Sequence, residues 1–172
     1  WTLHEKILEM PLNRYPEVTN SYIRGRIADY LGFEKENVLV GNGSDEIIDT
    51  IGKAFISPLD KVLIPAPTFS LYSAITRIYS GLPMVLPLNL DYSLPLENIL
   101  TNAKNAKMVI ICSPNNPTGV QYPDEELKAI LDTGILVILD EAYSEFSGHS
   151  GLHLLNHYDN LIVMKTFSKA FG

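Results

Sequence analysis

Lys169 follows shortly after an apolar segment, at a place where a lysine could act as a covalent nucleophile. Residues 161–164 (Leu-Ile-Val-Met) favour a β-strand, and the next eight residues contain hydroxyl groups and Lys169. In α/β proteins, ligands bind beyond the carboxyl ends of such strands. An amine there becomes a nucleophile when burial or a nearby cation lowers its pKa. The segment by itself is more typical of a strand end with a solvated cation, so Lys169 needs support from other residues.

A glycine-rich segment, Gly41–Glu46, lies between a predicted strand and a predicted helix. Glycines permit close backbone approach, and the free N–H groups and positive dipole of a helix start attract phosphate. An equally physical interpretation is that Ser44 caps the helix while Asp45 and Glu46 complement its dipole. Phosphate binding would require both acidic side chains to point away from the anion.

Two further polar segments follow predicted strands. In Ser113–Gly119, two prolines fix the backbone, so the amide of Asn116 could be held toward a ligand; a structural turn is the alternative. Asp140 ends the most apolar strand, where a carboxylate is costly unless it is paired. A cationic ring nitrogen would be a suitable partner, and Tyr143 could donate to a neighbouring oxygen. A helix cap or a structural ion pair would also explain Asp140.

Three histidines, His149, His153 and His157, recur every four residues. This spacing could align them on one helix face, as metal ligation requires. Gly148 and Gly151 place the helix start after His149. We therefore expect surface and helix-face histidines, and no metal site.

The composition describes a globular protein with an acidic surface. The 172 residues are 46% hydrophobic, and 13 basic against 20 acidic side chains give a net charge of −7. This charge disfavours a nucleic-acid partner, and no apolar run is long enough to cross a membrane. The single cysteine, Cys112, fits a buried strand thiol in a reducing, cytoplasmic setting. From the first residue, Trp1, and the ending after Gly172, we expect a piece of a longer protein.

Strands alternate with helices along most of the chain. Helical periodicity or capping signals occur at 20–32, 41–55, 69–79 (with Gly81 as C-cap), 123–133 and 150–158, and residues 91–100 are expected to form a loop and a short helix. Strand signals occur at 37–40, 61–65, 84–88, 107–112, 135–140 and 161–165. This order predicts an α/β fold with a mostly parallel, mixed sheet flanked by helices. We expect residues 1–19 to form a lead-in segment and residues 20–172 to form one domain.

Three of these segments together carry a resemblance. Ser-Pro-Asn-Asn-Pro-Thr-Gly (113–119), Asp-Glu-Ala-Tyr (140–143) and Thr-Phe-Ser-Lys-Ala-Phe-Gly (166–172) resemble the class I/II, fold-type I aminotransferases that depend on pyridoxal 5′-phosphate. The resemblance implies the large cofactor-binding domain of that fold, incomplete at the C-terminus. Residues 13–16 (Asn-Arg-Tyr-Pro), the Gly41–Glu46 loop and residues 168–171 are most similar to the histidinol-phosphate aminotransferase branch.

The resemblance also implies roles for the residues nearest the reacting atoms. Lys169 binds the cofactor covalently and then moves a proton between the substrate Cα and the cofactor. Asp140 pairs with the pyridine nitrogen, which makes the ring an electron sink. Asn116 and Tyr143 donate hydrogen bonds to the ring hydroxyl oxygen.

Other implied roles hold the cofactor in place. Phe69 stacks on the ring. Backbone N–H groups of Ser44 and Asp45 bind the phosphate, with the hydroxyls of Thr166 and Ser168. Tyr15 reaches the cofactor phosphate of a partner subunit, so the resemblance implies a homodimer.

The implied reaction transfers an amino group between L-histidinol phosphate and 2-oxoglutarate. The arginines that the family places against the cofactor phosphate and the substrate would lie beyond Gly172. We therefore expect this piece to be inactive or very weak alone. Three alternatives stay open: an aromatic aminotransferase, a threonine-phosphate decarboxylase, or a non-catalytic, aminotransferase-like regulatory domain.

Overall fold

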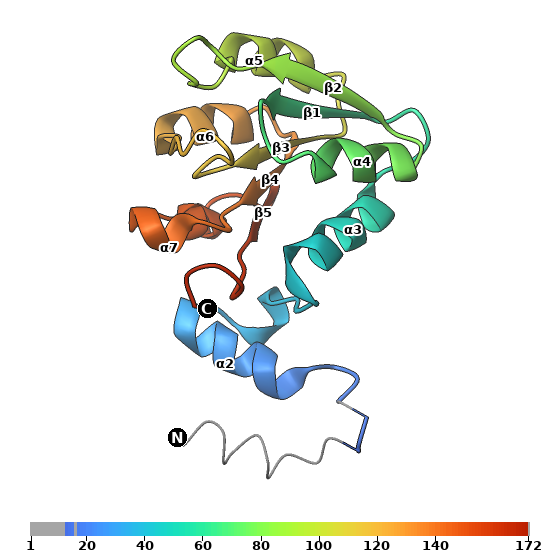
Figure 1. Ribbon diagram of the computed structural model, residues 1–172, viewed down its shortest axis with the longest axis vertical. Helices are drawn as coiled ribbons and strands as arrows, with labels where there is room; N and C mark the ends of the chain where they lie inside the picture. The colour runs from blue at the N-terminus through green and yellow to red at the C-terminus, as the bar shows by residue number, and fades with distance from the viewer. Residues whose placement is uncertain (1–12, 16, 172) are drawn as a thin grey trace. The chain divides into compact units, whose positions relative to one another are not determined.

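A computed structural model describes residues 13–15 and 17–171 (Figure 1). The chain divides into two compact units, residues 1–40 and residues 41–172. The sequence places a boundary after residue 19 instead. The assignment of residues 20–40 to the larger domain stays a prediction.

The described residues of the first unit include helix α2 and a short 3-10 turn. Helix α2 (Ser21–Leu31) ends at Gly32, which has a φ of 78° and donates its N–H to the carbonyl of Ala28. A glycine is suited to this left-handed position because it has no Cβ. The predicted helix is confirmed.

The strand predicted at 37–40 is wrong. Lys35–Asn37 form the 3-10 turn η1, and the following residues join no sheet. The Arg24 guanidinium donates to the carbonyls of Lys35 and Val38, each at 2.7 Å. Because a helix side chain already binds these carbonyls, the segment packs as an irregular connection.

The second unit is built on a five-stranded sheet. Its elements in chain order are α3 (Gly43–Phe55), β1 (Lys61–Ala66), α4 (Leu71–Ile78), β2 (Leu82–Pro87), α5 (Leu96–Ala103), β3 (Met108–Cys112), α6 (Asp124–Leu131), β4 (Leu136–Asp140), α7 (Ser144–Ser147), η2 (Gly151–Asn156) and β5 (Leu161–Met164). The strand order is β2-β1-β3-β4-β5, and all neighbouring strands are parallel. The predicted α/β class with a mostly parallel sheet flanked by helices is confirmed, although the sheet of the described residues is wholly parallel rather than mixed.

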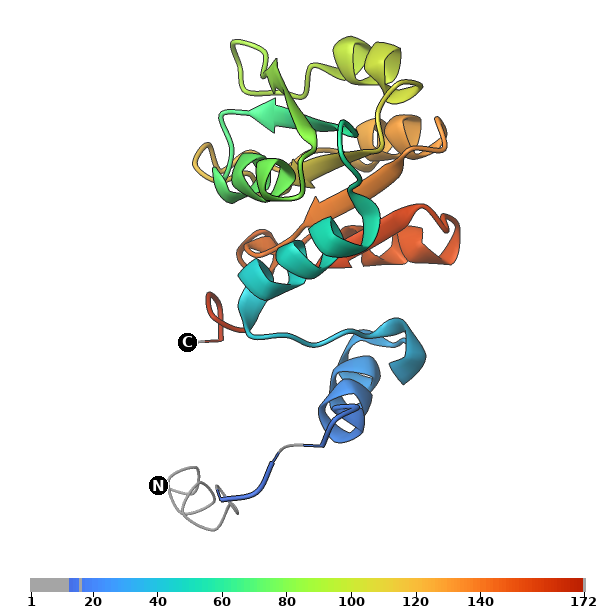
Figure 2. The ribbon, with the colours of Figure 1, turned by 90° about the vertical axis from the view of Figure 1, so that its right-hand side faces the viewer.

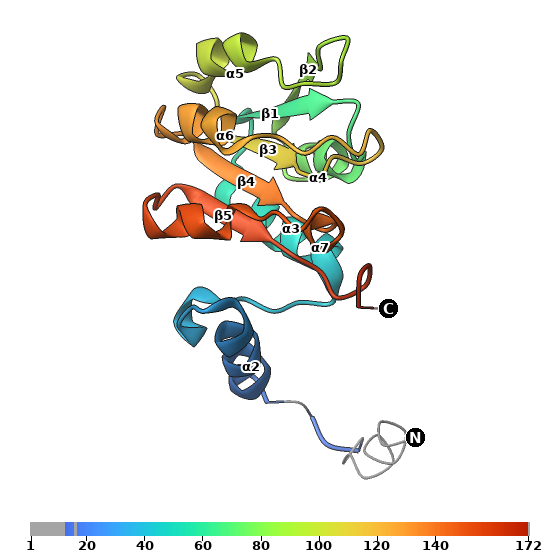
Figure 3. The ribbon, with the colours of Figure 1, turned by 90° about the vertical axis from the view of Figure 1, so that its left-hand side faces the viewer.

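Helices cover both faces of the sheet. Figure 2 looks onto the face covered by α3 (cyan) and α4 (green), and Figure 3 onto the face with α5 and α6. Ile64, Ile110 and Ile138 pack toward α3 and α4, whereas their neighbours Val109 and Val137 pack toward α5 and α6. This alternation follows from the two-residue period of a strand. Burial on both faces explains the nearly continuous apolar runs in the sequence.

Several element boundaries differ from the sequence prediction. Helix α4 ends at Ile78, and Ser80, with a φ of 62°, takes the left-handed conformation expected at Gly81. Gly81 is required for space: a Cβ there would lie 2.8 Å from Cγ2 of Ile56. The helix predicted at 150–158 is the 3-10 segment η2, and the four-residue helix α7 was not predicted.

The parallel arrangement brings four loops to one edge of the sheet. Parallel strands present their carboxyl ends together, and ligands bind there in open α/β sheets. The loops after β3, β4 and β5 carry polar segments singled out in the sequence, and the loop after β1 carries Phe69. No helix within the described residues is long and apolar enough to span a membrane.

Candidate active site

A cavity of about 450 Å³ opens at this edge of the sheet. The N-terminus of α3, the first turns of α4 and the ends of β3, β4 and β5 contribute to its wall. Its lining residues are Asn42, Gly43, Ser44, Asp45, Phe69, Tyr72, Cys112, Asn116, Asp140, Ala142, Tyr143, Ser168 and Lys169.

Asp140 is the buried carboxylate of this cavity. It is 4% exposed, and its Oδ1 accepts a hydrogen bond from the Ala142 N–H at 3.0 Å. Its Oδ2 accepts from the Tyr72 hydroxyl at 2.7 Å. Among the described residues, no Lys, Arg or His forms an ion pair with it. A cationic group entering the cavity would complete its interactions.

Burial controls the protonation of the groups around Asp140. It raises the pKa of Asp140, an effect that the Tyr72 and Ala142 hydrogen bonds oppose and that the nearby Asp45 and Glu141 charges reinforce. Burial, followed by the Asp140 charge, raises the pKa of Tyr72, so this phenol stays a hydrogen-bond donor. Burial also raises the pKa of the Cys112 thiol to about 11. Ionisation of a buried carboxylate with a raised pKa costs free energy. A cation that binds beside the ionised carboxylate offsets this cost, so the site favours a cationic ligand.

Helix α3 presents its N-terminus to the cavity. The helix begins at Gly43, and the preceding Asn42 makes no side-chain cap. The Glu46 carboxylate turns back to accept the Asn42 N–H, whereas Asp45 lines the cavity. Ser44 is therefore not the cap considered in the sequence. The first N–H groups of a helix have no partner within it and favour an anion.

The two asparagines after β3 have different positions. Asn115 is 4% exposed, and its Nδ2 donates to the Pro67 carbonyl at 3.0 Å and to Thr118 at 2.9 Å. Its Oδ1 accepts from Thr68 at 2.8 Å. Asn115 thereby connects the loops after β1 and β3. Asn116, the next residue, lines the cavity.

Lys169 lines the cavity beside Tyr143. Its Nζ lies 5.7 Å from the centre of the Tyr143 ring. Ser168 also lines the cavity, and its hydroxyl lies 2.8 Å from that of Thr166. The cavity thus combines an amine, a buried carboxylate, an aromatic ring and an anion-favouring helix start. These groups fit a phosphorylated, cationic heteroaromatic ring that carries a carbonyl.

Comparison with known proteins supports the same conclusion. Residues 5–172 match the family described as Aminotransferase class I and II. The chain belongs to this family. A histidinol-phosphate aminotransferase of Pyrococcus furiosus is 43% identical over 175 residues, which cover 99% of this chain and 51% of that protein. The enzyme of the same name from Thermococcus gammatolerans is 44% identical over 171 residues, covering 99% and 49%.

The chain therefore spans about half the length of the curated relatives it matches. The solved histidinol-phosphate aminotransferase of Clostridium acetobutylicum superposes with a TM-score of 0.87 at 25% identity, covering 99% of this chain and 52% of that one. The one from Sinorhizobium meliloti, in complex with pyridoxal-5′-phosphate, gives 0.88 at 24% identity, covering 99% and 48%, and shows the shared fold. An L-threonine-O-3-phosphate decarboxylase from Porphyromonas gingivalis gives 0.82 at 26% identity, covering 99% and 52%.

Most side chains named from the sequence meet in this cavity. Those on its wall are Ser44, Asp45, Phe69, Asn116, Asp140, Tyr143, Ser168 and Lys169. Thr166 does not line the cavity and contacts Ser168 instead. Tyr15 belongs to the first unit, with a fully exposed side chain. Its role toward a partner subunit stays a prediction.

Sequence reasoning missed Tyr72, Cys112 and Ala142 as cavity residues. Tyr72 lies three residues after Phe69, a spacing that places two side chains on one side of a helical turn. This signal was available, although a tyrosine in an apolar helix pattern is also an ordinary core residue. The backbone N–H of Ala142 has no sequence signal.

Two of the three histidines, His149 and His153, form a surface cluster with Asp124 rather than a helical row. Nε2 of His149 lies 3.0 Å and Nε2 of His153 lies 2.7 Å from the two oxygens of Asp124. Over residues 13–15 and 17–171, no group of three or more potential ligands is arranged to hold a metal ion.

Proposed function

We propose that the full-length protein containing this chain is a pyridoxal-phosphate-dependent aminotransferase. The observation that carries the proposal is one cavity with Lys169, the start of α3 and the buried carboxylate of Asp140, which has no counter-ion among the described residues, in its wall. When bound, pyridoxal phosphate supplies an electron sink for the electron pair released at the substrate Cα. The membership of the aminotransferase class I and II family supports this cofactor.

One group of residues would hold the cofactor in position. The backbone N–H groups of Ser44 and Asp45, with the Ser168 hydroxyl, bind the phosphate, and Thr166 supports Ser168. Phe69 stacks on the ring. These contacts fix the position of the ring before substrate arrives, and correct positioning is a large part of catalysis.

Three polar side chains control charge at the ring. Asp140 keeps a proton on the ring nitrogen, because a buried carboxylate is strongly stabilised by a cation at hydrogen-bond distance. Asn116 and Tyr143 donate hydrogen bonds to the ring hydroxyl oxygen. The Lys169 amine holds the cofactor between turnovers and, when displaced, carries the proton at the substrate Cα.

For the substrate, we propose L-histidinol phosphate as amino donor and 2-oxoglutarate as acceptor. The products would be imidazole acetol phosphate and L-glutamate, a step of histidine biosynthesis. The support is the 37–44% identity to proteins named histidinol-phosphate aminotransferase. We also propose a cytoplasmic homodimer in which Tyr15 reaches the cofactor phosphate of the partner subunit.

A second candidate is decarboxylation of a phosphorylated amino acid. The likeness to the threonine-phosphate decarboxylase at 26% identity favours it. The two reactions differ in the bond broken at Cα, and the groups that orient the substrate lie largely outside this chain. Substrate titration distinguishes them.

The test is the visible spectrum of the full-length protein with pyridoxal phosphate, titrated with L-histidinol phosphate in the absence of an oxo acid. We expect the band of lysine-bound cofactor to convert to that of pyridoxamine phosphate. A band that responds only to tyrosine or glutamate would support the assignment as an aminotransferase and reject L-histidinol phosphate as the amino donor. Release of CO₂ from O-phosphothreonine would favour the decarboxylase. Absence of a lysine-bound band would reject the enzyme proposal.

A further inference from the structure

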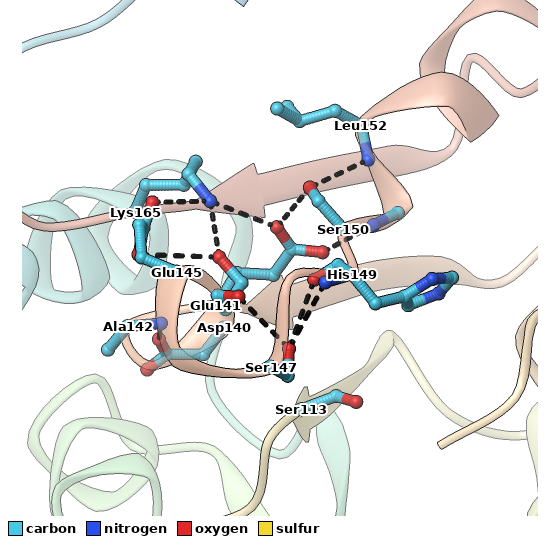
Figure 4. A network of polar contacts seen from close by, with 12 residues as sticks. Ser113, Asp140, Glu141, Ala142, Glu145, Ser147, His149, Ser150, Leu152 and Lys165 are labelled. Atoms are coloured by element: carbon cyan, nitrogen blue, oxygen red, sulfur yellow. Dashed lines mark hydrogen bonds and ion pairs between the residues drawn. The ribbon is translucent and has the colours of Figure 1, made fainter. Parts of the chain in front are cut away.

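A second lysine, Lys165, lies four residues before Lys169 and outside the cavity. Its Nζ lies 2.9 Å from Glu145 Oε1 and 3.3 Å from Glu141 Oε2, and it also donates to the Ser144 hydroxyl (Figure 4). Lys165 is 20% exposed at its side chain, against 1% for Glu141 and 18% for Glu145. This cluster of one ammonium and two carboxylates is therefore largely removed from water.

Glu141 has a complete set of partners. Its Oε1 accepts the Gly151 N–H at 2.5 Å, and its Oε2 accepts the Ser150 hydroxyl as well as the Lys165 ammonium. Figure 4 shows the Ser150 hydroxyl and the Lys165 ammonium converging on this carboxylate. The ammonium is the only cation among the described groups that pair with Glu141 or Glu145. Removing it would leave two neighbouring carboxylates with no counter-charge in a poorly solvated place, which is strongly unfavourable.

The cluster connects the two loops that carry Tyr143 and Lys169. Glu141 and Glu145 flank Tyr143 in the loop and helix after β4, and Ser144 follows Tyr143 directly. Lys165 begins the segment that leads from β5 to Lys169. The backbone adds one bond at this point, from the Glu141 N–H to the Met164 carbonyl at 2.8 Å. Beyond it, the Lys165 side chain makes the polar contacts to Ser144 and Glu145.

We propose that Lys165 is a positioning residue for the active site. Its ion pairs with Glu141 and Glu145 fix the loop of Tyr143 against the segment of Lys169. This inference rests on the proposed function, because it assigns the cluster a role toward the bound cofactor. Lys165 touches neither the cavity nor the reacting atoms. Its effect is on geometry, and a displacement of about 1 Å in an active site can cost about 100-fold in rate.

The test compares Lys165→Met with Lys165→Arg in the full-length protein. Arginine keeps the charge and can contact both carboxylates, whereas methionine keeps the apolar stem alone. Lys35→Met is the matched control, because Lys35 also pairs with a glutamate, at 4.0 Å, but both side chains are more than half exposed. The readouts are the visible circular dichroism of bound pyridoxal phosphate, the cofactor Kd, and kcat with KM.

We expect Lys165→Met to lose most of the cofactor dichroism and to lower kcat by about 10- to 100-fold with a smaller change in KM. Borohydride should still attach the cofactor to Lys169. Lys165→Arg should restore both readouts to within about threefold, and Lys35→Met should match the parent protein. Unchanged dichroism and kcat in a folded Lys165→Met variant would overturn the proposal, as would failure of arginine to restore them.

Glu145→Gln provides the test if Lys165→Met does not fold. This change keeps the pair between Lys165 and the buried Glu141 and removes the more exposed carboxylate. We expect a weaker loss of the same kind, about threefold in kcat with reduced dichroism. No change in either would overturn the proposal. If the parent protein binds pyridoxal phosphate but ignores L-histidinol phosphate, the substrate proposal fails, while the comparison of dichroism still tests Lys165.

Discussion

Two lysine–carboxylate sets lie at the ends of β4 and β5, and they differ in what they leave unpaired. Asp140 and Lys169 line the cavity, whereas their near neighbours Glu141 and Lys165 form an ion pair. Glu141 has hydrogen bonds on both oxygens and a cation, but Asp140 has two neutral donors and no cation among the described residues. Asp140 is the last residue of β4 and Glu141 is the next residue, so the end of β4 supplies the carboxylates of both sets, and the segment after β5 supplies both lysines.

The difference in counter-ions gives the two carboxylates, Glu141 and Asp140, different roles, the first in stability and the second in ligand binding. A buried carboxylate with a complete set of partners stabilises local geometry, whereas one without a counter-ion has a free energy that a ligand can lower. Asp140 shows the second behaviour through its raised pKa. The carboxylate without a counter-ion, Asp140, therefore lies in the cavity, and the next residue, Glu141, belongs to the set of paired charges.

The largest effect is expected from Lys169→Ala, which removes the amine from the cavity. Turnover of the full-length protein should fall by at least about 10⁴-fold, because both the covalent link and the proton carrier are lost. Steady-state assays and the visible spectrum check this result. Retention of more than about one per cent of the parent rate would assign the chemistry to another group.

Asp140→Asn should have the next largest effect. The neutral amide cannot keep a proton on the ring nitrogen, so kcat should fall by about 10²- to 10³-fold while some cofactor still binds. Single-turnover measurements at saturating cofactor separate the chemical step from binding. Turnover close to that of the parent protein would mean that Asp140 is not the partner of the ring.

Glu141→Gln should mainly lower the free energy of unfolding. The change removes one of the two carboxylates paired with Lys165 and weakens the hydrogen bonds that Glu141 accepts from Ser150 and Gly151, which costs about 2 kcal/mol of unfolding free energy. Denaturant titration of the full-length protein measures this value. The matched change Glu145→Gln, at a carboxylate that is 18% exposed, should cost less, about 1 kcal/mol or below. Equal costs for the two variants would contradict the contrast in burial.

Tyr72→Phe should change the pH dependence of cofactor binding. The Tyr72 hydrogen bond lowers the pKa of Asp140 against the effect of burial, so its loss raises that pKa further. Ionised Asp140 holds the cationic ring, and cofactor affinity therefore falls as pH drops through this pKa. In Tyr72→Phe the fall should begin about one pH unit higher.

Tyr79→Phe is the control for this prediction. Tyr79 also donates to a carboxylate, Asp49, at 2.9 Å, but it does not line the cavity. Cofactor titrations across pH should show no shift for this variant. The folding stability of the cofactor-free protein has the opposite pH dependence to cofactor affinity. Because the pKa of Asp140 is raised by folding, its contribution to the free energy of unfolding becomes more favourable as pH falls. An identical pH profile in Tyr72→Phe and the parent protein would rule out this role of Tyr72.

The fold was largely predictable because its signals are strong and local. The apolar runs that end at Cys112 and Asp140 are typical of strands buried on both faces, and both are central strands. The segment 37–40 was mispredicted because its Val38 carbonyl accepts a hydrogen bond from Arg24 rather than from a neighbouring strand, and its Leu39 side chain is exposed. Whether a short run joins a sheet depends on a partner that its own sequence does not specify.

The site was predictable where a residue's type implies its chemistry. Lys169, Asp140 and Asn116 follow strand ends, and parallel strands bring such ends together. The donors to Asp140 were harder to predict, because one is a backbone N–H and the other, Tyr72, resembles a core aromatic residue. The role of Lys165 was hidden for a related reason. Its partners Glu141 and Glu145 lie more than 15 positions away, and only the fold joins them.

The most direct test of the account is to identify the lysine that binds the cofactor. The full-length protein is mixed with pyridoxal phosphate, reduced with borohydride, digested and mapped by mass spectrometry. We predict that the pyridoxyl group is found on Lys169 and not on Lys165, because Lys169 lines the cavity while two carboxylates hold Lys165 outside it. Modification of Lys165 instead, or of neither lysine, would contradict the assignment of the two sets.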